Sequence, residues 1–446
     1  MNIPASAATV KKSLFIIVLS LIYFASSPAH AVLKVDITRG QMNPMPIALD
    51  NFTGDAVGSE IVSVVSADLE RSGLFRPIDQ NAFIQRNVGV EATPRFADWR
   101  KINAQAVVTG SITPAAGGKV TVAFRLWDVL SEKQFAGKTF STDPANWRRV
   151  AHMVSDEIYS RLTGEGAYFD SRIVYVAEED RGARKVRSHR LAMMDQDGAN
   201  QVYLSDGMDM VLSPRFSPTQ QKIIYMGYHG RIPAVYLYDI ESGRETLIGN
   251  FKGMSFAPRF SPDGQKAVMS VSEDGNIEVY ELDLNSRTAT RLTRHPGIDT
   301  SPSYSPDGSK IVFNSDRGGP QQLYIMNRDG SGVKRISFGK GRYGTPVWSP
   351  RGDYIAFTKQ TGGSFHIGVM RPDGSGERLL TESYFDEAPT WSPNGRVLVF
   401  TRKDKGSRGR EGVSRLFSVD LTGYNERVVK TSGEASDPAW SPLLSK

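Results

Sequence analysis

The sequence predicts a mixed fold, in which an N-terminal α/β (α+β) domain is followed by an all-β six-bladed β-propeller. Three observations predict it: a pentapeptide that recurs six times, short β-rich runs between its copies, and a repeat-free region before the first copy. Of the 446 residues, 39% are hydrophobic and 23% are charged, so we expect a globular chain.

Composition excludes several classes of function. The chain has no cysteine, which rules out disulfides, cysteine-based zinc or iron–sulfur sites and thiol nucleophiles. The net charge is only +6, which gives no reason to expect a nucleic-acid partner.

Residues 1–31 have the pattern of a secretory signal peptide. Lys11 and Lys12 form a basic region, residues 13–24 form an apolar run, and Ala29-His30-Ala31 is a small-residue cleavage site. A membrane anchor is less favoured, because a spanning helix needs about 20 apolar residues. We expect a soluble mature protein that begins at Val32, lies outside the cytoplasm and carries a net charge of +4.

The order Pro, any residue, aromatic residue, Ser, Pro defines the repeat. Its copies begin at Pro214, Pro258, Pro302, Pro346, Pro389 and Pro438, with spacings of 44, 44, 44, 43 and 49 residues. Ser-Pro-Asp-Gly after the aromatic residue favours a type I turn. Runs such as 310–314, 323–326 and 333–337 then predict three further strands, which makes each unit a propeller blade. The aromatic residues are predicted to form the core between blades.

Incomplete units at the two ends predict one shared blade. Residues 171–176, 191–194 and 201–204 resemble the second to fourth strands of a unit, whereas 438–441 resembles a first strand with nothing after it. We predict that the C-terminal strand closes the ring of a propeller spanning 166–446, which leaves no open sheet edge.

Residues 32–165 lack the repeat and are predicted to form a separate α/β domain. Amphipathic helices are predicted over 55–72 and 145–162, the second with Asp143 as N-cap and Pro144 as its first residue. Strands are predicted over 45–49, 106–112, 120–127 and 135–140.

The first mature residues are predicted to form a partner-binding arm. Apolar and polar side chains alternate along it in a strand-like pattern that favours pairing with this domain or with another protein. Its residues are Val32, Leu33, Lys34, Val35, Asp36, Ile37 and Thr38.

No catalytic constellation is found. Gly253–Ala257 misses the Gly-x-Ser-x-Gly motif of hydrolases, and the histidines are not spaced as metal ligands on one element. Gly339–Gly344 matches Gly-x-Gly-x-x-Gly but leads into a repeat strand. Asp195–Gly198 is interpreted as a hairpin turn, because an EF-hand would have Glu where Asp206 stands. The sequence predicts no cofactor and leaves a divalent ion in the propeller channel open.

The basic run 402–410 accounts for the longest spacing between repeats. We interpret it as a solvated blade loop, with binding to an anionic surface as the alternative.

The whole chain resembles the TolB family, the periplasmic component of the Tol–Pal system of Gram-negative bacteria. The resemblance rests on the secretion signal, the repeat-free domain, the six Ser-Pro-Asp-Gly-type units and the closing Pro438–Pro442. Departures from the turn pattern at Thr219-Gln220, Arg351-Gly352 and Asn394-Gly395 put those single turns in doubt.

The resemblance implies a non-enzymatic, monomeric, periplasmic protein that contacts membranes only through partners. In this family the propeller binds the lipoprotein Pal at one end of its channel. The N-terminal segment, here Val32 to about Asn43, communicates with the C-terminal domain of TolA. The system supports outer-membrane integrity and envelope constriction during division, and other envelope proteins are further candidate partners.

The loops that lead into the six repeat strands are expected on one face, because every blade runs in the same direction. On this face the sequence predicts the Pal-binding residues Met254, Ser255, Phe256, Ala257, Asp299, Thr300, Arg342, Tyr343, Tyr384, Phe385 and Asp386. They mix aromatic anchors with charge, as binding surfaces often do. The resemblance places the interface at 254–257 and 299–300, and about half of the residues in these loops are expected only to cap strands.

Two other classes of function remain open. One is a secreted peptide-binding propeller that is related to peptidase propellers but has no catalytic activity. The other is a propeller lyase or lactonase, which would need polar groups and usually a metal in its channel.

Overall fold

The computed structural model describes residues 43–181, 186–228, 233–248, 251, 253–273, 275–407 and 412–444. The predicted signal peptide and the arm residues Val32 to Thr38 lie outside these ranges. Among the helices of the described residues, none has the length and apolar character needed to cross a membrane.

The N-terminal region is built on a five-stranded sheet with the order β2-β1-β3-β4-β5. Its strands are β1 (Met45–Leu49), β2 (Phe75–Pro77), β3 (Ala106–Pro114), β4 (Val120–Asp128) and β5 (Lys133–Thr142). β1 pairs in parallel with β2 and β3, and the remaining pairs are antiparallel. A parallel pair needs a crossover connection, which a helix between β1 and β2 provides.

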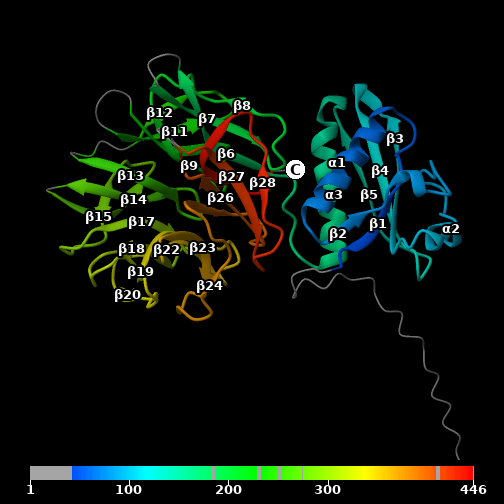
Figure 1. Ribbon diagram of the computed structural model, residues 1–446. Coiled ribbons are helices and arrows are strands. Elements are labelled where there is room, and N and C mark those ends of the chain that lie inside the picture. Colours follow the sequence, from blue (N-terminus) through cyan, green and yellow to red (C-terminus); the bar gives the residue numbers. More distant parts are fainter. Residues whose placement is uncertain are drawn as a thin grey trace, which may run out of the picture. The chain divides into compact units, whose positions relative to one another are not determined.

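Two long helices, α1 (Val57–Arg71) and α3 (Trp147–Thr163), pack together beside this sheet (Figure 1). Both have the predicted apolar stripe, and Ile61, Leu69, Val154 and Ile158 are buried. The prediction for the start of α3 is wrong. Pro144 begins a separate 3-10 turn, and the Asp143 side chain caps no amide.

A short helix, α2 (Phe96–Lys101), belongs to the other face of the sheet. Phe96 packs edge-on against Trp127, whereas Phe124 stacks on Phe140. Phe124 and Trp127 are three residues apart on β4, so their side chains point to opposite faces of the sheet. The 3-10 turns of this region are η1 (Gln80–Ala82), η2 (Ala116–Gly118) and η3 (Pro144–Asn146).

Six four-stranded antiparallel sheets follow, in agreement with the predicted propeller (Figure 1). The first two are β9 (Val211–Phe216), β10 (Lys222–Gly227), β11 (Ala234–Asp239) and β12 (Glu245–Leu247), then β13 (Met254–Phe260), β14 (Lys266–Glu273), β15 (Asn276–Asp283) and β16 (Ala289–Arg291). The third and fourth are β17 (Asp299–Tyr304), β18 (Lys310–Ser315), β19 (Gln322–Asn327) and β20 (Lys334–Arg335), then β21 (Arg342–Trp348), β22 (Ile355–Thr361), β23 (Ser364–Met370) and β24 (Arg378–Leu379). The fifth is β25 (Asp386–Trp391), β26 (Val397–Lys403), β27 (Ser414–Asp420) and β28 (Arg427–Val429).

The sixth sheet joins the two ends of the propeller sequence. Its order is β29-β6-β7-β8, with β29 (Glu434–Trp440), β6 (Arg172–Arg181), β7 (Val186–Asp195) and β8 (Val202–Tyr203). β29 pairs antiparallel with β6, with Trp440 opposite Ile173. This is the pairing that the incomplete units predicted, and it closes the ring without a covalent link.

The turn after each repeat strand explains the Ser-Pro-Asp-Gly pattern. The Ser261 hydroxyl accepts a hydrogen bond from the Lys266 amide. The Gly264 amide donates a hydrogen bond to the Ser261 carbonyl, and Gly264 has a φ of +70°. The two doubtful turns that keep glycine have the same bond, because Gly352 and Gly395 donate to the carbonyls of Ser349 and Ser392. The repeat aromatic residues pack between blades, as predicted; Trp348, for example, lies in one cluster with Val312.

A strained residue stands directly before the first proline of every repeat. Ser213, Ala257, Ser301, Thr345, Ala388 and Asp437 have φ between +43° and +55°. The register of all six first strands shifts at this point, which is a β-bulge. Each such residue costs about 1–3 kcal/mol, so the packed blades must hold it in place.

Candidate functional site

The blades give the propeller two different faces. Each first strand begins on what we call the mouth face and ends at a Ser-Pro turn on what we call the Ser-Pro face. Because the strands of a blade alternate in direction, the loops between second and third strands also lie on the mouth face. The turns between third and fourth strands lie on the Ser-Pro face.

A cavity of about 340 Å³ lies at the mouth, on the channel side of the first strands. The six strained bulge residues all line it, together with Met254, Phe256 and two arginines. At the other end, a hollow of about 590 Å³ is lined by the Ser-Pro turns of the blades. The bulges therefore decide which side chains face the channel at the mouth.

Large apolar side chains are exposed around this mouth. Among the described residues, five of the six entries into a first strand expose at least one, including Met208, Met254, Ile298, Phe338 and Tyr384. Their exposed fractions range from 38% for Ile298 to 80% for Met208. Exposed apolar residues that gather on one face can mark a binding surface on a soluble protein.

Seven of the eleven residues predicted for this surface remain able to contact a partner. Met254, Phe256 and Ala257 line the cavity, whereas Arg342 and Tyr384 are exposed at its rim. The other two are half-buried: Thr300 accepts a hydrogen bond from Asn314, and Phe385 packs on Phe365.

The other four, Ser255, Asp299, Tyr343 and Asp386, are buried. Asp299 binds the Arg317 guanidinium at 2.6 Å, and Asp386 binds Arg402 through both carboxylate oxygens at 2.7 and 2.8 Å. Burial removes these four side chains from direct contact with a partner. Asp299 and Asp386 hold the loops that present their exposed neighbours.

Met208, Met210 and Phe338 at the same mouth were missed by sequence reasoning. The topological rule would have found them, because each stands in a loop that leads into a first strand: Met208 and Met210 precede β9, and Phe338 lies a few residues before the predicted Arg342.

Four charged residues lie in the channel cavity, on four consecutive blades. Glu387 and Asp437 come from β25 and β29, and Arg215 and Arg259 come from β9 and β13. Burial, with the nearby charge of Asp437, raises the pKa of Glu387 to about 7. Burial and the neighbouring Arg215 lower the pKa of Arg259 well below its usual value.

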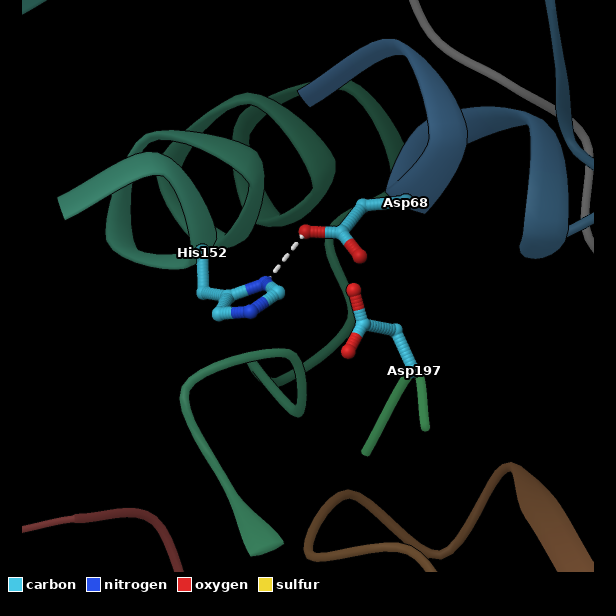
Figure 2. A group of neighbouring side chains, drawn as sticks. All are labelled: Asp68, His152 and Asp197. Carbon is cyan, nitrogen blue, oxygen red and sulfur yellow. Dashed lines mark hydrogen bonds and ion pairs between the residues drawn. The ribbon is translucent and has the colours of Figure 1, made fainter. Parts of the chain in front are cut away.

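A second charged cluster lies where α1 and α3 meet the turn between β7 and β8 (Figure 2). His152 Nδ1 is 2.7 Å from Asp68 Oδ2, and both side chains are buried. Gln196, in that turn, donates to Asp68 at 2.9 Å. Burial alone would lower the pKa of His152, but the charge and hydrogen bond of Asp68 raise it above its usual value.

Asp68, His152 and Asp197 have ligand atoms within 4.8 Å of one another, the spacing of a metal site. Two arginines already occupy these carboxylates, however. Arg71 binds Asp68 at 2.8 Å, and Arg148 is paired with Asp197. A dication would have to displace both guanidinium groups, so the chemistry fits an ion-pair network.

Other contacts between the N-terminal region and the propeller also use turns of the Ser-Pro face. Asn425 donates to the Arg71 carbonyl at 2.8 Å, and Asn394 donates to the Gly166 carbonyl at 2.8 Å. Asp195–Gly198 forms the predicted hairpin turn, with the Gly198 amide bonded to the Asp195 carbonyl. Asp197 of this turn was not foreseen as part of the contact.

The basic run begins with the last two residues of β26 and continues into the connection to β27, where Arg408 to Arg410 are outside the described part of the chain. Arg402, at its start, is paired with Asp386 and Glu426. Gly339–Gly341 form a blade loop, as predicted, whereas Arg342 to Gly344 are already the first residues of β21.

Comparisons with known proteins agree with this architecture. The TolB amino-terminal domain family matches residues 33–135, and the TolB beta propeller domain family matches residues 159–444. The Tol-Pal system protein TolB of Paramagnetospirillum magneticum is 63% identical over 423 residues, which are 94% of each chain. The chain belongs to the TolB family. It is therefore a component of the Tol–Pal system.

Solved structures support the same family. The crystal structure of TolB from Acinetobacter baumannii is 32% identical and has a TM-score of 0.80, over 92% of this chain and all of that one. A chain of Kuenenia stuttgartiensis hydrazine synthase covers 63% of this chain, and this chain covers 47% of it. At 13% identity and a TM-score of 0.50, it shares the fold alone. The TolB-type assignment thus rests on both domains and not on the propeller alone.

Proposed function

We propose that this TolB-family chain is a periplasmic, non-enzymatic scaffold that binds Pal through the mouth face. Its N-terminal arm, Val32 to about Asn43, contacts the C-terminal domain of TolA. In this way the protein links the outer membrane to the inner membrane and supports outer-membrane integrity and envelope constriction during division.

The observation that carries the Pal site is the ring of exposed apolar side chains around the mouth cavity. Exposed Met254 and Tyr384 come from different blades, and Phe256 lines the cavity between blades. Protein interfaces concentrate their binding energy in a few aromatic and apolar anchors that fill pockets. A cavity with apolar residues at its rim suits a protein partner that inserts side chains into it.

The strained bulges support the same conclusion. Backbone strain clusters at functional sites, where the surrounding structure holds it. Here the strain recurs at the six residues that line the mouth, including the β-branched Thr345 at φ +43°. A partner that docks there would meet a rigid, preorganised rim, which lowers the entropic cost of binding.

The TolA contact rests on the family resemblance and on the alternating pattern of residues 32–38. Removing residues 32–43 from the mature chain should abolish binding of the TolA C-terminal domain and leave thermal unfolding unchanged. Retained TolA binding would exclude the arm as the contact.

A calorimetric titration of residues 32–446 with the soluble domain of Pal from the same organism tests the Pal site. We expect saturable one-to-one binding that Met254→Asp weakens strongly, because a charge replaces an exposed apolar contact. The matched control is Val333→Asp, which changes an exposed valine beside the third turn of a blade, on the Ser-Pro face. If the titration shows no heat, and a competition titration shows no displacement by the Pal domain, then the mouth serves another partner.

A further inference from the structure

The two channel arginines occupy equivalent places in neighbouring blades. Arg215 and Arg259 each follow the first proline of the repeat, on β9 and β13. The other four blades have small or uncharged residues there: Ser303, Val347, Thr390 and Ala439. The repeat architecture does not require arginine at this place, so the pair makes one side of the channel basic.

These guanidinium groups have no carboxylate partner among the described residues. Among the described residues, no carboxylate oxygen lies within 4 Å of a guanidinium nitrogen of Arg215 or Arg259. Arg215 Nη1 donates at 2.6 Å to the carbonyl of the adjacent Pro214, and its buried Nε has no acceptor. Leaving a buried donor unpaired costs about 1–3 kcal/mol, and more when the group is charged.

The acidic residues of the cavity neutralise this pair only in part, because Asp437 is the one carboxylate among the described residues whose charge raises the pKa of Arg215 and of Arg259. Asp437 Oδ2 accepts the Ser213 amide at 3.0 Å, which ties the carboxylate to the backbone. Glu387 is near Asp437, and its carboxyl group, with a pKa of about 7, is partly protonated in neutral solution. Among the described residues, the remaining titratable group of the lining is Tyr228. Two guanidinium groups of the described lining therefore face one carboxylate and one partly protonated carboxyl group.

We propose that Arg215 and Arg259 form a binding site for one carboxylate group inside the channel. Guanidinium groups bind carboxylates through paired, parallel hydrogen bonds, and these are strongest where water is excluded. The cavity of about 340 Å³ has room for a carboxylate and the chain that carries it.

This carboxylate could come from two sources. One is a free small carboxylic acid of the periplasm. The other is an acidic side chain of the protein that docks on the mouth, and in that form the inference rests on the proposed function. The mouth is lined by Met254 and Phe256 next to the arginines, so a docked acidic residue could reach them.

Thermal unfolding of residues 32–446 in rising sodium acetate, from a low-chloride buffer, tests the site without any partner. A ligand that binds only the folded chain raises the unfolding temperature as its concentration rises. We expect acetate to stabilise the wild type and to lose this effect in Arg259→Gln. Arg287→Gln, an exposed arginine in the β15–β16 turn, is the matched control and should respond like the wild type.

The inference is overturned if acetate leaves the wild type unchanged, or if it shifts all three proteins equally. In acetate-free buffer, Arg259→Gln should be at least as stable as the wild type, because it removes a buried charge that lacks a partner. If Arg259→Gln does not fold, Arg215→Gln gives the same test at the neighbouring blade.

Titrating the Pal domain at several acetate concentrations separates the two sources. Competition by acetate, absent in Arg259→Gln, would identify the partner's own acidic side chain as the occupant. Pal binding that acetate does not affect would identify a free carboxylate. If Pal does not bind at all, the proposed function fails, whereas the acetate-dependent unfolding still decides whether the carboxylate site exists.

Discussion

The charged cluster at the contact with the N-terminal region and the charged residues of the channel differ in how their charges are paired. At the contact with the N-terminal region, on the Ser-Pro face, Asp68 is bonded to His152 and Arg71, and Asp197 is paired with Arg148. In the channel at the mouth, Arg215 and Arg259 have no described carboxylate partner. The paired charges hold the contact together, whereas the channel arginines are the groups for which we propose a carboxylate ligand.

Apolar surface follows the same division. At the N-terminal contact, Tyr168 is buried and packs edge-on against Trp440. At the mouth, Met254, Phe338 and Tyr384 are exposed. The contact with the N-terminal region is thus saturated by packing within the chain, whereas the mouth keeps apolar side chains exposed to another molecule.

Breaking the buried ion-pair cluster of Asp68, His152 and Arg71 should have the largest effect on stability. Asp68→Asn leaves Arg71 and His152 without their buried counter-charge, so we expect the free energy of unfolding to fall by about 3–5 kcal/mol in urea titrations. Asp404→Asn, which breaks the exposed ion pair with Arg415, should cost about 1 kcal/mol or less. Equal losses in the two variants would show that the buried cluster carries no special stability.

Phe256→Ala should have the largest effect at the mouth. Because Phe256 lines the cavity between blades, its loss should weaken binding of the Pal domain roughly 30-fold, or about 2 kcal/mol, in calorimetric titrations. Val333→Ala on the opposite face should bind like the wild type. An unchanged affinity in Phe256→Ala would move the interface away from the cavity.

His152 should make the contribution of this buried ion-pair cluster to the free energy of unfolding depend on pH. Its pKa is raised by Asp68 in the folded chain, so its contribution is complete below about 6.5 and is lost as pH rises through the folded pKa. The difference in unfolding free energy between the wild type and His152→Gln should therefore shrink as the pH rises above about 6.5. A difference that stays constant or grows would show that the protonated imidazole is not what Asp68 stabilises.

Tyr384→Ala should have the smallest effect. Tyr384 is 56% exposed at the rim, outside the cavity lining, and rim contacts contribute little binding energy. We expect the Pal affinity to fall less than fivefold, by about 1 kcal/mol or less. A loss as large as that of Phe256→Ala would place the binding centre over β25 rather than over the channel.

The fold was largely predictable because each repeat unit makes the same turn and the same packing contacts. Ser261 and its equivalents close the same turn, and the aromatic residues fill the same gap between blades, so one unit determines the others. Gly352 and Gly395 keep the turn where the sequence departs from the pattern. By contrast, α2 and β2 were not predicted, because a six-residue helix and a three-residue strand are too short to show a period.

The site was predictable only as a set of loops. Topology placed Met254 and Tyr384 on one face, but which neighbour is buried depends on partners distant in sequence, such as Arg317 for Asp299. The channel charges were also not foreseen, since Arg215 looks like an ordinary variable residue of the repeat. Its place in the folded chain, two residues after the bulge, puts it in the channel beside charged residues from three other blades.

Hydrogen exchange of the mature chain, with and without the Pal domain, tests the central claim most directly. We predict that Pal slows exchange most at the starts of the first strands, above all at residues 254–257 and 343–345, and leaves the Ser-Pro turns unchanged. Strongest protection at the Ser-Pro turns, with none at residues 254–257, would contradict the assignment of the mouth as the binding face.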